Sequence, residues 1–345
     1  MKKVETASRL SQRHFRERVR ARLSRNTHQI VFALDGIPGK LVDTLWQTPV
    51  IERWHAVFPA TSTTGWLSSL TGLGVEEHGI PGVVFRYNDQ PDSLINICQY
   101  QGEALAIPTD NIFHDARRCG YLPQAVIGDL LPIEGTWTRA LLDGVEIIDR
   151  SVFFTLSPPQ PVWALLETLK TAIKSALERT DVPTLVWIFI DIDHYVHTQG
   201  YDAHVTAFLL GIDELASALT QQGCDVIAHS DHGLVPVIHD EQLAHQIDLL
   251  CEQFGATMGG AGLTRWFYVP DDRVAEFHRR LTDRLGEFAE IIYATELDDM
   301  PARVGNLVLI ARGERFIASP GYRYEHGSRQ PDELDVFYAV WETPC

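Results

Sequence analysis

The sequence has few cysteines and no long apolar run. Its 345 residues include only five scattered cysteines and no CxxC pair: Cys98, Cys119, Cys224, Cys251 and Cys345. This usage is typical of free thiols in a reducing compartment, so we expect a cytoplasmic protein. The longest apolar run, TLVWIFI, has the length of one strand, and the N-terminal region has no apolar core of signal-peptide length. The sequence therefore predicts neither a membrane-spanning helix nor a secretory signal.

Basic residues are also scarce. Lysine and arginine number 29 against 46 aspartates and glutamates, which gives a formal net charge of −17. Such a chain is a poor binder of nucleic-acid polymers and anionic membranes, because both select basic surfaces. The exception is the N-terminal region, where the first 26 residues carry +7 and leave −24 on the rest. We expect a basic helical arm over residues 1–28 ahead of an acidic body over residues 29–345. The arm either packs on this body or binds a polyanion.

Strand-like and helix-like segments alternate along most of the chain. Buried strands are expected at HQIVFALDG, PTLVWIFIDIDH and CDVIAHSDHG, and further strands at RWFYV and NLVLIAR. Helices are expected among them, for example at VWALLETLKTAIKSALERT and AHVTAFLLGIDELASALTQQG. This alternation favours an α/β fold with a mostly parallel central sheet covered by helices on both faces. The loop SPPQPV at residues 157–162 is a candidate joint to a small inserted cap region.

Acidic residues end three of the expected strands. The first strand ends in Asp35, the second in Asp191 and Asp193, and the third in Asp231. Ligands bind beyond the carboxyl ends of the strands in such sheets. A single carboxylate at a strand end commonly caps the following helix. Three such clusters, two of them with histidines attached, are harder to explain by capping and mark a candidate site.

Histidines accompany these acids. His197 follows Asp193 by four residues, a spacing that puts both side chains on one face of a helix. His232 directly follows Asp231, and His326 lies near the C-terminus in the segment YEHGSRQPDE. Carboxylate oxygens and imidazole nitrogens together suit Zn²⁺ or a similar borderline metal ion. The sequence therefore predicts a metal centre at the ends of the strands.

Hydroxyl groups crowd the start of one helix-like segment. FPATSTTGWLSSLTG, residues 58–72, holds seven serine and threonine residues. A hydroxyl is a poor nucleophile until a metal or a base activates it, and a helix N-terminus attracts phosphate oxygens. One of these hydroxyls is therefore a candidate nucleophile. The alternative is an ordinary helix with a capping hydroxyl and several packing residues.

Five short motifs, taken in order, resemble the nucleotide pyrophosphatase/phosphodiesterase branch of the alkaline phosphatase superfamily. They are LDG at residues 34–36, FPATSTTGWLSSLTGLGVEEHGIPG at 58–82, DHYVHTQG at 193–200, SDHG at 230–233 and EHG at 325–327. Each motif is weak by itself, but their order over nearly the whole chain is specific. The resemblance implies an alkaline-phosphatase-like catalytic domain over residues 29–345 and an enzyme that hydrolyses phosphate esters.

The resemblance also implies roles for the site residues. One divalent cation would be held by Asp193, His197 and His326. The second would be held by Asp35, Asp231 and His232, with Ser62 as a further ligand. Zn²⁺ is the expected ion, with Mn²⁺ or Fe as alternatives. Two such ions can clamp both the attacking and the leaving oxygen of an in-line displacement. Ser62 stands at the nucleophile position, between Thr61 and Thr63, and would form a phosphoseryl intermediate that water then releases.

The residues around the nucleophile depart from the family pattern. Ser62 is followed by Thr63, Thr64 and Gly65, where the nucleotide-cleaving branch usually has an asparagine. Thr63 and Arg86 are the candidate substrate-binding residues. We expect hydrolysis of a phosphodiester or a nucleotide pyrophosphate, in a small phosphorylated substrate such as a nucleotide.

Two alternatives stay open. The first is hydrolysis of phosphomonoesters, phosphonates or sulfate esters on the same core. The second is a non-catalytic member that binds phosphorylated ligands, although the complete set of ligands argues against it. The sequence leaves the oligomeric state undetermined.

Three further residues close to these motifs receive structural interpretations. His78 is expected to support the structure around the nucleophile helix. His229 is expected to be a core histidine with satisfied hydrogen bonds. Trp66 follows Ser62 by one helical turn, so it either packs in the core or stacks on a nucleotide base.

Overall fold

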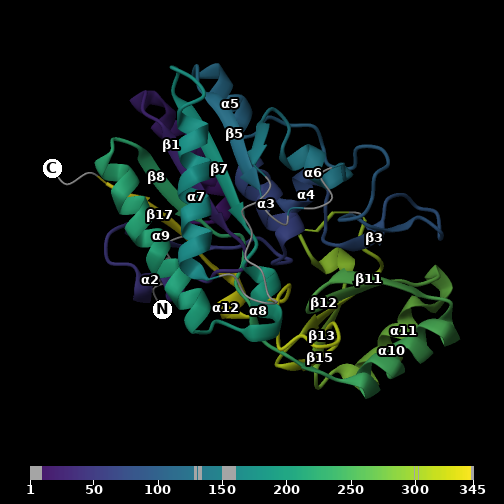
Figure 1. The fold of residues 1–345 in the computed structure, drawn as a ribbon. Helices are drawn as coiled ribbons and strands as arrows, with labels where there is room; N and C mark the ends of the chain where they lie inside the picture. Colours follow the sequence, from purple (N-terminus) through teal and green to yellow (C-terminus); the bar gives the residue numbers. More distant parts are fainter. Residues whose placement is uncertain are drawn as a thin grey trace, which may run out of the picture.

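Two sheets of different character organise the molecule (Figure 1). The computed structural model describes residues 10–127, 130, 134–149, 161–298, 300–301 and 303–342. The candidate joint at residues 157–162 therefore lies outside the described residues, apart from its last two positions. Among the helices of the described ranges, none combines the length and the apolar character needed to cross a membrane.

The larger sheet has seven strands in the order β2-β17-β8-β1-β7-β5-β6. These strands are β1 (Gln29–Leu34), β2 (Val50–His55), β5 (Leu122–Ile127), β6 (Glu146–Asp149), β7 (Thr184–Ile190), β8 (Asp225–His229) and β17 (Asp335–Trp341). Neighbours from β8 to β6 pair in parallel, whereas β17 pairs antiparallel with both β8 and β2. The α/β fold is thus confirmed, and its sheet is mixed.

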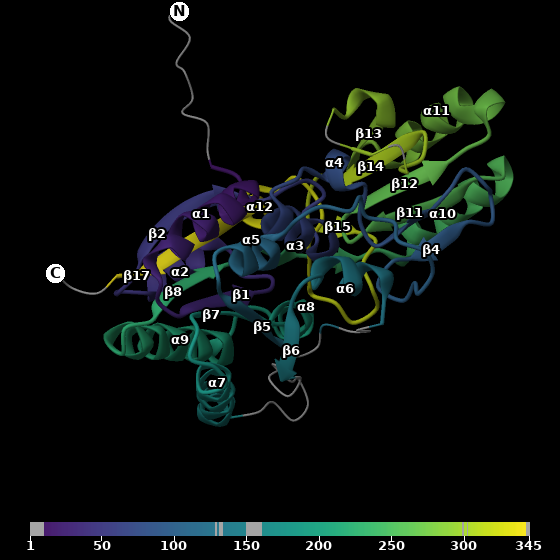
Figure 2. The ribbon, with the colours of Figure 1, turned by 90° about the horizontal axis from the view of Figure 1, so that it is seen from above.

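Helices cover both faces of this sheet (Figure 2). On one face lie α1 (Phe15–Arg22), α3 (Ser62–Thr71) and α5 (Ile112–Arg118). On the other lie α2 (Gly39–Leu45), α7 (Val162–Leu177) and α9 (Ala203–Gln221). Alternate residues of β7 enter the two cores, with Trp187 on the α3 side and Ile188 on the α7 side. A central strand buried on both faces explains why its sequence is apolar throughout.

The second sheet has six strands, all antiparallel, in the order β13-β14-β12-β11-β3-β4. The strands are β3 (Val84–Arg86), β4 (Leu94–Asn96), β11 (Thr257–Ala261), β12 (Thr264–Tyr268), β13 (Ala289–Tyr293) and β14 (Leu307–Ala311). Helices α10 (Glu241–Phe254) and α11 (Val274–Leu285) share one core with it. RWFYV and NLVLIAR belong here: both are strands as predicted, but they pair antiparallel and lie outside the central sheet. A tight turn at Gly262, with φ of +51°, makes β11 and β12 a hairpin.

Shorter elements complete the described structure. They are α4 (Val75–His78), α6 (Thr136–Leu141), α8 (Asp193–Gln199), α12 (Pro331–Leu334), β9 (Val235–Pro236), β10 (Ile238–His239), β15 (Arg315–Phe316) and β16 (Tyr324–Glu325), with 3₁₀ turns η1 (Gln12–His14), η2 (Leu23–Arg25), η3 (Asp271–Arg273) and η4 (Ala294–Glu296). Strand β16 pairs antiparallel with β9. The backbone of Leu263, in the hairpin turn, donates to His326 O at 2.7 Å, so the second sheet reaches the candidate site.

The described part of the basic N-terminal segment packs on the acidic body. The Phe15 ring stacks on the His229 ring with centroids 3.5 Å apart. The buried Arg22 guanidinium binds the Asp225 carboxylate through two nitrogens, with Nε to Oδ2 at 2.8 Å. Of the two interpretations of this segment, these contacts support packing. The predicted boundary at residue 28 falls between η2 and β1 and stays a prediction.

Candidate metal centre and nucleophile

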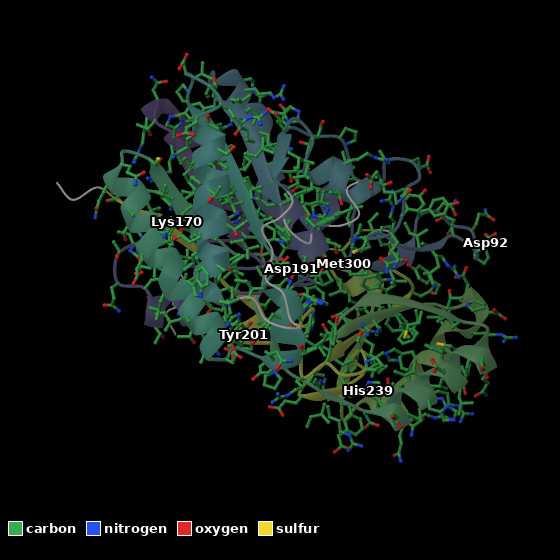
Figure 3. The ribbon with its side chains drawn as sticks, in the orientation of Figure 1. Asp92, Lys170, Asp191, Tyr201, His239 and Met300 are labelled. Atoms are coloured by element: carbon green, nitrogen blue, oxygen red, sulfur yellow. The ribbon has the colours of Figure 1, made fainter. Side chains whose placement is uncertain are left out.

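The predicted ligands converge where the strands of the central sheet end. Asp35 follows β1, Asp193 opens α8 after β7, and the pair Asp231 and His232 follows β8. Figure 3 labels Asp191 and Tyr201 at the end of the central sheet that faces the second sheet. Gly36 permits this convergence, because a Cβ on it would lie 2.9 Å from Asp193 Cα. The site thus forms at the edge expected for an α/β sheet.

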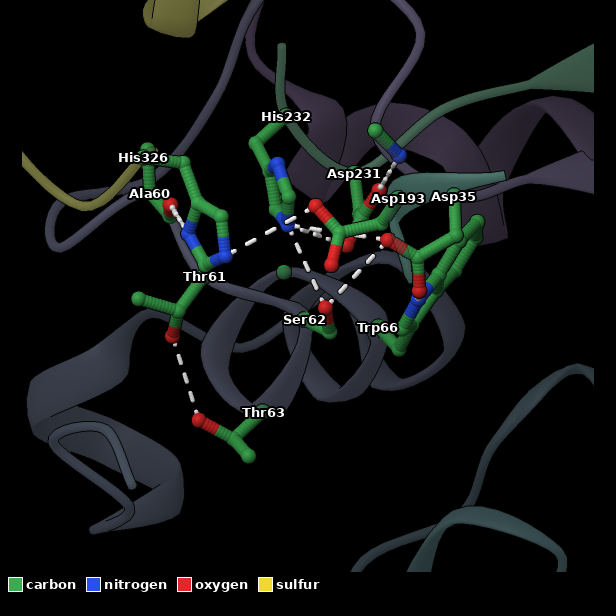
Figure 4. Close-up of polar contacts among 12 residues, drawn as sticks. Asp35, Ala60, Thr61, Ser62, Thr63, Trp66, Asp193, Asp231, His232 and His326 are labelled. Carbon is green, nitrogen blue, oxygen red and sulfur yellow. Dashed lines mark hydrogen bonds and ion pairs between the residues drawn. The ribbon is translucent and has the colours of Figure 1, made fainter. Parts of the chain in front are cut away.

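One group consists of Asp35, Asp231 and His232, all buried (Figure 4). His232 Nε2 lies 3.2 Å from Asp231 Oδ2 and 3.6 Å from Asp35 Oδ1. The Gly36 amide donates to Asp231 Oδ1 at 3.2 Å, whereas Asp231 Oδ2 accepts no hydrogen bond within the described residues. An orphaned buried carboxylate oxygen beside an imidazole nitrogen is the environment of a metal ligand. These three residues fit a divalent cation.

A second group surrounds Asp193. Its Oδ2 lies 3.0 Å from His197 Nε2, and its Oδ1 lies 3.7 Å from His326 Nε2. Asp193 Oδ1 accepts no hydrogen bond in the described part of the chain. The rings of His326 and His232 stack with centroids 4.0 Å apart, so the two groups are immediate neighbours. The candidate ligand atoms of Asp193, His232 and His326 also lie within 4.8 Å of one another. The two groups therefore form one continuous cluster.

The three imidazoles of the cluster have the same orientation. Each Nδ1 faces a backbone carbonyl: His197 faces Tyr324 O at 2.8 Å, His232 faces Gly233 O at 3.2 Å, and His326 faces Ala60 O at 2.9 Å. A carbonyl only accepts, so each Nδ1 carries the proton and donates. Each Nε2 then turns toward the carboxylates. Backbone groups that fix the tautomer in this way are typical of histidines that ligate metals.

The protonation equilibria reflect crowded buried carboxylates. Burial, followed by repulsion from Asp231 and Asp193, raises the pKa of Asp35 well above its usual range. Burial likewise raises the pKa of Asp231 to about 6. Burial opposes ionisation of Asp193, but attraction by His197 and His326 holds its pKa below the usual range. A cation among these carboxylates would relieve their repulsion.

The imidazoles respond in two ways. Burial lowers the pKa of His232 and of His326 to about 4, so both rings are neutral at physiological pH and free to bind a cation. Burial also acts to lower the pKa of His197, but the Asp193 carboxylate outweighs it and raises that pKa to about 9. In the absence of a metal ion, the protonated His197 ring thus supplies the positive charge next to Asp193.

Ser62 is the hydroxyl that points into the cluster. It is the first residue of α3, and its Oγ donates to Asp35 Oδ1 at 3.3 Å and lies 3.2 Å from His232 Nε2 (Figure 4). The neighbouring hydroxyls of Thr61 and Thr63 instead bond to each other at 3.1 Å. Ser62 and Asp193 stay partly exposed while Asp35 is buried, so solvent reaches the cluster from their side.

The remaining predicted residues lie in different settings. Trp66 is fully buried, and its Nε1 donates to Asp35 Oδ2 at 2.9 Å, so it supports a candidate ligand and has no face free for a base. His78 bonds to Ser68 Oγ and to the Ile80 amide, as the structural interpretation predicts. For His229, the expectation of satisfied hydrogen bonds is wrong, because neither ring nitrogen has a partner among the described residues. Its ring is held by stacking on Phe15 instead.

The two candidate substrate-binding residues face away from the cluster in this structure. The Thr63 hydroxyl is buried against Thr61. Arg86 donates to Thr257 Oγ1 at 2.6 Å and lies over the Tyr268 ring, at the edge of an open cleft of about 1210 Å³ beside the second sheet. Their role in substrate binding stays a prediction.

Three residues near the cluster were missed from the sequence. The Tyr201 hydroxyl donates to Gly36 O at 2.7 Å and accepts from the Leu234 amide at 2.9 Å, which ties two ligand-bearing loops together. The Tyr322 ring stacks on His197 with centroids 4.0 Å apart. Glu325 lies beside two candidate ligands. Only Glu325 had a signal in the sequence, as the acid preceding His326 in EHG.

Comparison with known families gives a match over most of the chain. The family described as type I phosphodiesterase / nucleotide pyrophosphatase matches residues 30–329. These residues include every candidate ligand and the candidate nucleophile, but exclude the N-terminal segment that packs on the sheet. A search of curated proteins finds no match.

Solved structures of low sequence identity share the fold. Murine ectonucleotide pyrophosphatase/phosphodiesterase 5 aligns with a TM-score of 0.66 at 14% identity, over 92% of this chain and 88% of that one. Its inactive form in complex with AMP aligns with a TM-score of 0.64 at 14% identity, over 91% of this chain and 87% of that one. Phosphonoacetate hydrolase from Sinorhizobium meliloti 1021, in complex with phosphonoformate, aligns with a TM-score of 0.66 at 18% identity. The alignment covers 92% of this chain and 90% of that one.

Proposed function

Because this chain belongs to the type I phosphodiesterase/nucleotide pyrophosphatase family, we propose that it hydrolyses a phosphodiester or a nucleotide pyrophosphate with Ser62 as the nucleophile. One observation carries the proposal. Ser62 Oγ lies within 3.3 Å of Asp35 and 3.2 Å of His232, at the start of a ten-residue helix. A hydroxyl that only caps a helix would bond to the backbone amides of the first turn. This hydroxyl bonds to two candidate metal ligands.

We propose that the residues of the cluster hold two divalent cations. Asp193, His197 and His326 would hold one, and Asp35, Asp231 and His232 the other. Zn²⁺ suits this mixture of imidazole and carboxylate ligands, and Mn²⁺ or Fe are alternatives. Bound there, such cations supply positive charge that favours the ionised hydroxyl and the negative charge of the phosphoryl group.

The chain itself contributes position and polarity. Asp35 and His232 hold the Ser62 oxygen at the open side of the cluster, where a phosphorus atom can approach it. The Ser62 oxygen forms a bond to phosphorus as the leaving group departs, and water then cleaves the phosphoseryl bond. The N-terminal end of the α3 dipole favours negative phosphoryl oxygens at that point.

The substrate is proposed to be a small phosphorylated molecule in the cytoplasm. Phosphorylated or phosphonate ligands occupy the similar solved structures, which bind AMP, phosphonoformate or phosphonoacetate. The four cysteines among the described residues form no disulfide with one another, which supports a reducing compartment: Cys98, Cys119, Cys224 and Cys251.

A second candidate function is hydrolysis of a phosphomonoester, a phosphonate or a sulfate ester. The segment after Ser62 favours it, because Thr63, Thr64 and Gly65 follow Ser62 without the asparagine that the nucleotide-cleaving branch usually has there, and the Thr63 hydroxyl is engaged by Thr61. Initial rates on bis(p-nitrophenyl) phosphate, p-nitrophenyl phosphate, p-nitrophenyl sulfate and phosphonoacetate, with added Zn²⁺ or Mn²⁺, separate the candidates. The proposal expects the highest kcat/KM on the diester. Inertness of the metal-loaded protein toward all four would favour a binding protein.

Ser62→Ala tests the nucleophile. We expect kcat to fall by at least about 10³-fold, as it does when a covalent nucleophile is removed, with the metal content unchanged. The matched control is Thr71→Val, which removes a hydroxyl in the last turn of the same helix that donates to the Leu67 carbonyl, and it should leave kcat within about tenfold. Near-normal turnover by the Ser62→Ala variant would end this mechanism. Trapping of a phosphorylated serine in the wild-type chain by rapid quench would support it directly.

A further inference from the structure

The hairpin of β11 and β12 extends from the second sheet to the loop that carries His326. The Leu263 amide in its turn donates to His326 O at 2.7 Å. The Thr264 hydroxyl, which is fully buried, donates to the carbonyl of the next residue, Gly327, at 2.6 Å. Two consecutive residues of the hairpin therefore hold two consecutive carbonyls of a loop that carries a candidate ligand.

The turn of the hairpin lies too close to this loop to carry a side chain at Gly262. A Cβ on Gly262 would lie 1.9 Å from His326 O, well inside contact distance. Gly262 also has φ of +51°, a conformation that glycine adopts readily. The turn is braced from within, because the Arg265 guanidinium donates to the carbonyls of Gly262 and Thr264. The tip of the hairpin is therefore shaped to the backbone of His326.

The hairpin is anchored in a core that is separate from the two cores of the central sheet. The Leu263 side chain is fully buried in the core that the second sheet shares with α10 and α11, while its amide holds His326. The carboxylates of the cluster follow strands of the central sheet instead: Asp35, Asp193 and Asp231. The second sheet therefore fixes the backbone of one candidate ligand against carboxylates that the central sheet positions.

The contacts of the His326 ring complete this arrangement (Figure 4). Its Nδ1 donates to Ala60 O at 2.9 Å, which sets the direction of the ring. Its Nε2, the nitrogen that is free to bind a cation, lies 3.7 Å from Asp193 Oδ1. The ring starts from the backbone that the hairpin holds, so a displaced backbone would move Nε2 relative to Asp193.

We propose that the β11–β12 hairpin positions His326 for cation binding, and that Thr264 is a positioning residue through its bond to Gly327. The inference rests on the proposed two-cation function and gives the second sheet a part in it. Coupling free energies are reciprocal, so a hairpin that strengthens cation binding is itself stabilised when the cation binds. Both directions of this coupling can be measured.

The first measurement is cation affinity in full-length proteins that have been stripped with a chelator. Thr264→Val removes the hydroxyl donor, whereas Thr264→Ser keeps it. Thr220→Val is the matched control, because the buried Thr220 hydroxyl likewise donates to a backbone carbonyl, that of Ala216 at 2.9 Å, within α9. Calorimetric titration with Zn²⁺ is expected to give two binding events in the wild type. One of them should weaken at least about tenfold in Thr264→Val, and both should be retained in Thr264→Ser and Thr220→Val.

The second measurement is hydrogen exchange of the hairpin in the wild type and in Thr264→Val. Saturating Zn²⁺ should slow exchange of the Leu263 amide in the wild type, because the cation stabilises the loop that accepts its hydrogen bond. This gain in protection should be smaller in Thr264→Val. Strand β13, at the far edge of the second sheet, is the internal control, and its exchange should slow less.

Three results would overturn the inference while leaving the proposed function in place, provided that the wild type binds two cations. They are an unchanged Zn²⁺ affinity in Thr264→Val, an equal loss of affinity in Thr220→Val, and a hairpin whose exchange does not respond to Zn²⁺. A Thr264→Ser variant as weak as Thr264→Val would overturn the role of the hydroxyl. Absence of Zn²⁺ binding by the wild type would overturn the proposed function as well.

Discussion

At the scale of single residues, the site depends on side chains that hold loops at fixed separations. Tyr201 is the clearest case, because one hydroxyl joins the Gly36 carbonyl after Asp35 to the Leu234 amide after His232. Gly36 itself leaves no room for a side chain against Leu234 and Asp193. Residues that orient ligands in this way affect metal affinity without touching the ion.

Tyr201→Phe should therefore weaken cation binding. The substitution leaves a backbone carbonyl and an amide without their partner, at about 1–3 kcal/mol of folding stability. We expect the affinity for at least one cation to fall about tenfold, measured by titration of the chelator-treated protein. Tyr268→Phe is the control, since the Tyr268 hydroxyl likewise joins two backbone groups, the Arg303 carbonyl and the Arg86 amide, but lies in the second sheet. Equal cation affinities in Tyr201→Phe and the wild type would refute the proposal that the Tyr201 hydroxyl holds the ligand-bearing loops in place.

The candidate ligands could be named from the sequence because each follows a strand or lies at helical spacing from another ligand. Asp193 and His197 show this, since their four-residue spacing became a 3.0 Å contact on α8. Tyr201 and Tyr322 could not be named, because their contacts come from chain segments far apart in sequence. His229 was misjudged for a similar reason: its environment is set by Phe15, more than 200 residues away.

At the scale of elements, the nucleophile helix α3 is held at both ends by the N-terminal segment. The buried Gln12 donates to the Gly65 carbonyl at 2.7 Å in the first turn and accepts from the Val57 amide at 3.0 Å. Arg16 donates to the Thr71 carbonyl at 3.0 Å in the last turn. Gly65 allows this close packing, since a Cβ there would lie 2.8 Å from Asp231 Cβ and 3.0 Å from Gln12 Nε2.

Gln12→Ala should loosen the start of α3. It leaves the Gly65 carbonyl and the Val57 amide unpaired, and each unpaired group costs about 1–3 kcal/mol of stability in chemical denaturation. Because Ser62 opens the same helix, we expect kcat to fall between about tenfold and 100-fold with a smaller change in KM. Arg20→Gln, at an exposed position of α1, is the control. If Gln12→Ala lost stability but kept its kcat, Gln12 would not be needed to position Ser62.

The elements themselves were largely predictable, whereas their partners were not. Apolar runs such as TLVWIFI identified strands correctly, because burial on both faces removes polar residues from the sequence. RWFYV and NLVLIAR were also strands, but periodicity carries no information on the neighbouring strand or its direction. They pair antiparallel in a second sheet, and β17 enters the central sheet antiparallel after a four-residue helix.

At the scale of the whole molecule, buried neutral histidines make stability sensitive to acid. His78 accepts the Ile80 amide on Nδ1 and contacts Ser68 through Nε2, and burial lowers its pKa to about 3. The unfolded chain therefore binds the proton first, at a pKa of about 6.5. The contribution of His78 is complete above that pH and is lost as the pH falls toward 3, by up to about 1.4 kcal/mol for each pH unit.

Urea denaturation between pH 7 and pH 5 checks this expectation. Both the wild type and His78→Gln should be treated with a chelator, so that acid release of metal does not contribute. The wild type should lose stability with a steeper slope than His78→Gln, whose amide can serve the same two partners without titrating. Parallel slopes would mean that His78 does not contribute to acid sensitivity.

The stack of Phe15 on His229 has a practical consequence. Phe15 and Val19 fill one face of the central sheet, although the family match begins only at residue 30. A recombinant fragment trimmed to the family boundary would uncover that apolar face directly behind Asp231 and His232. Poor solubility of such a fragment would then reflect the uncovered apolar face, and it would not show that the 345-residue chain folds poorly.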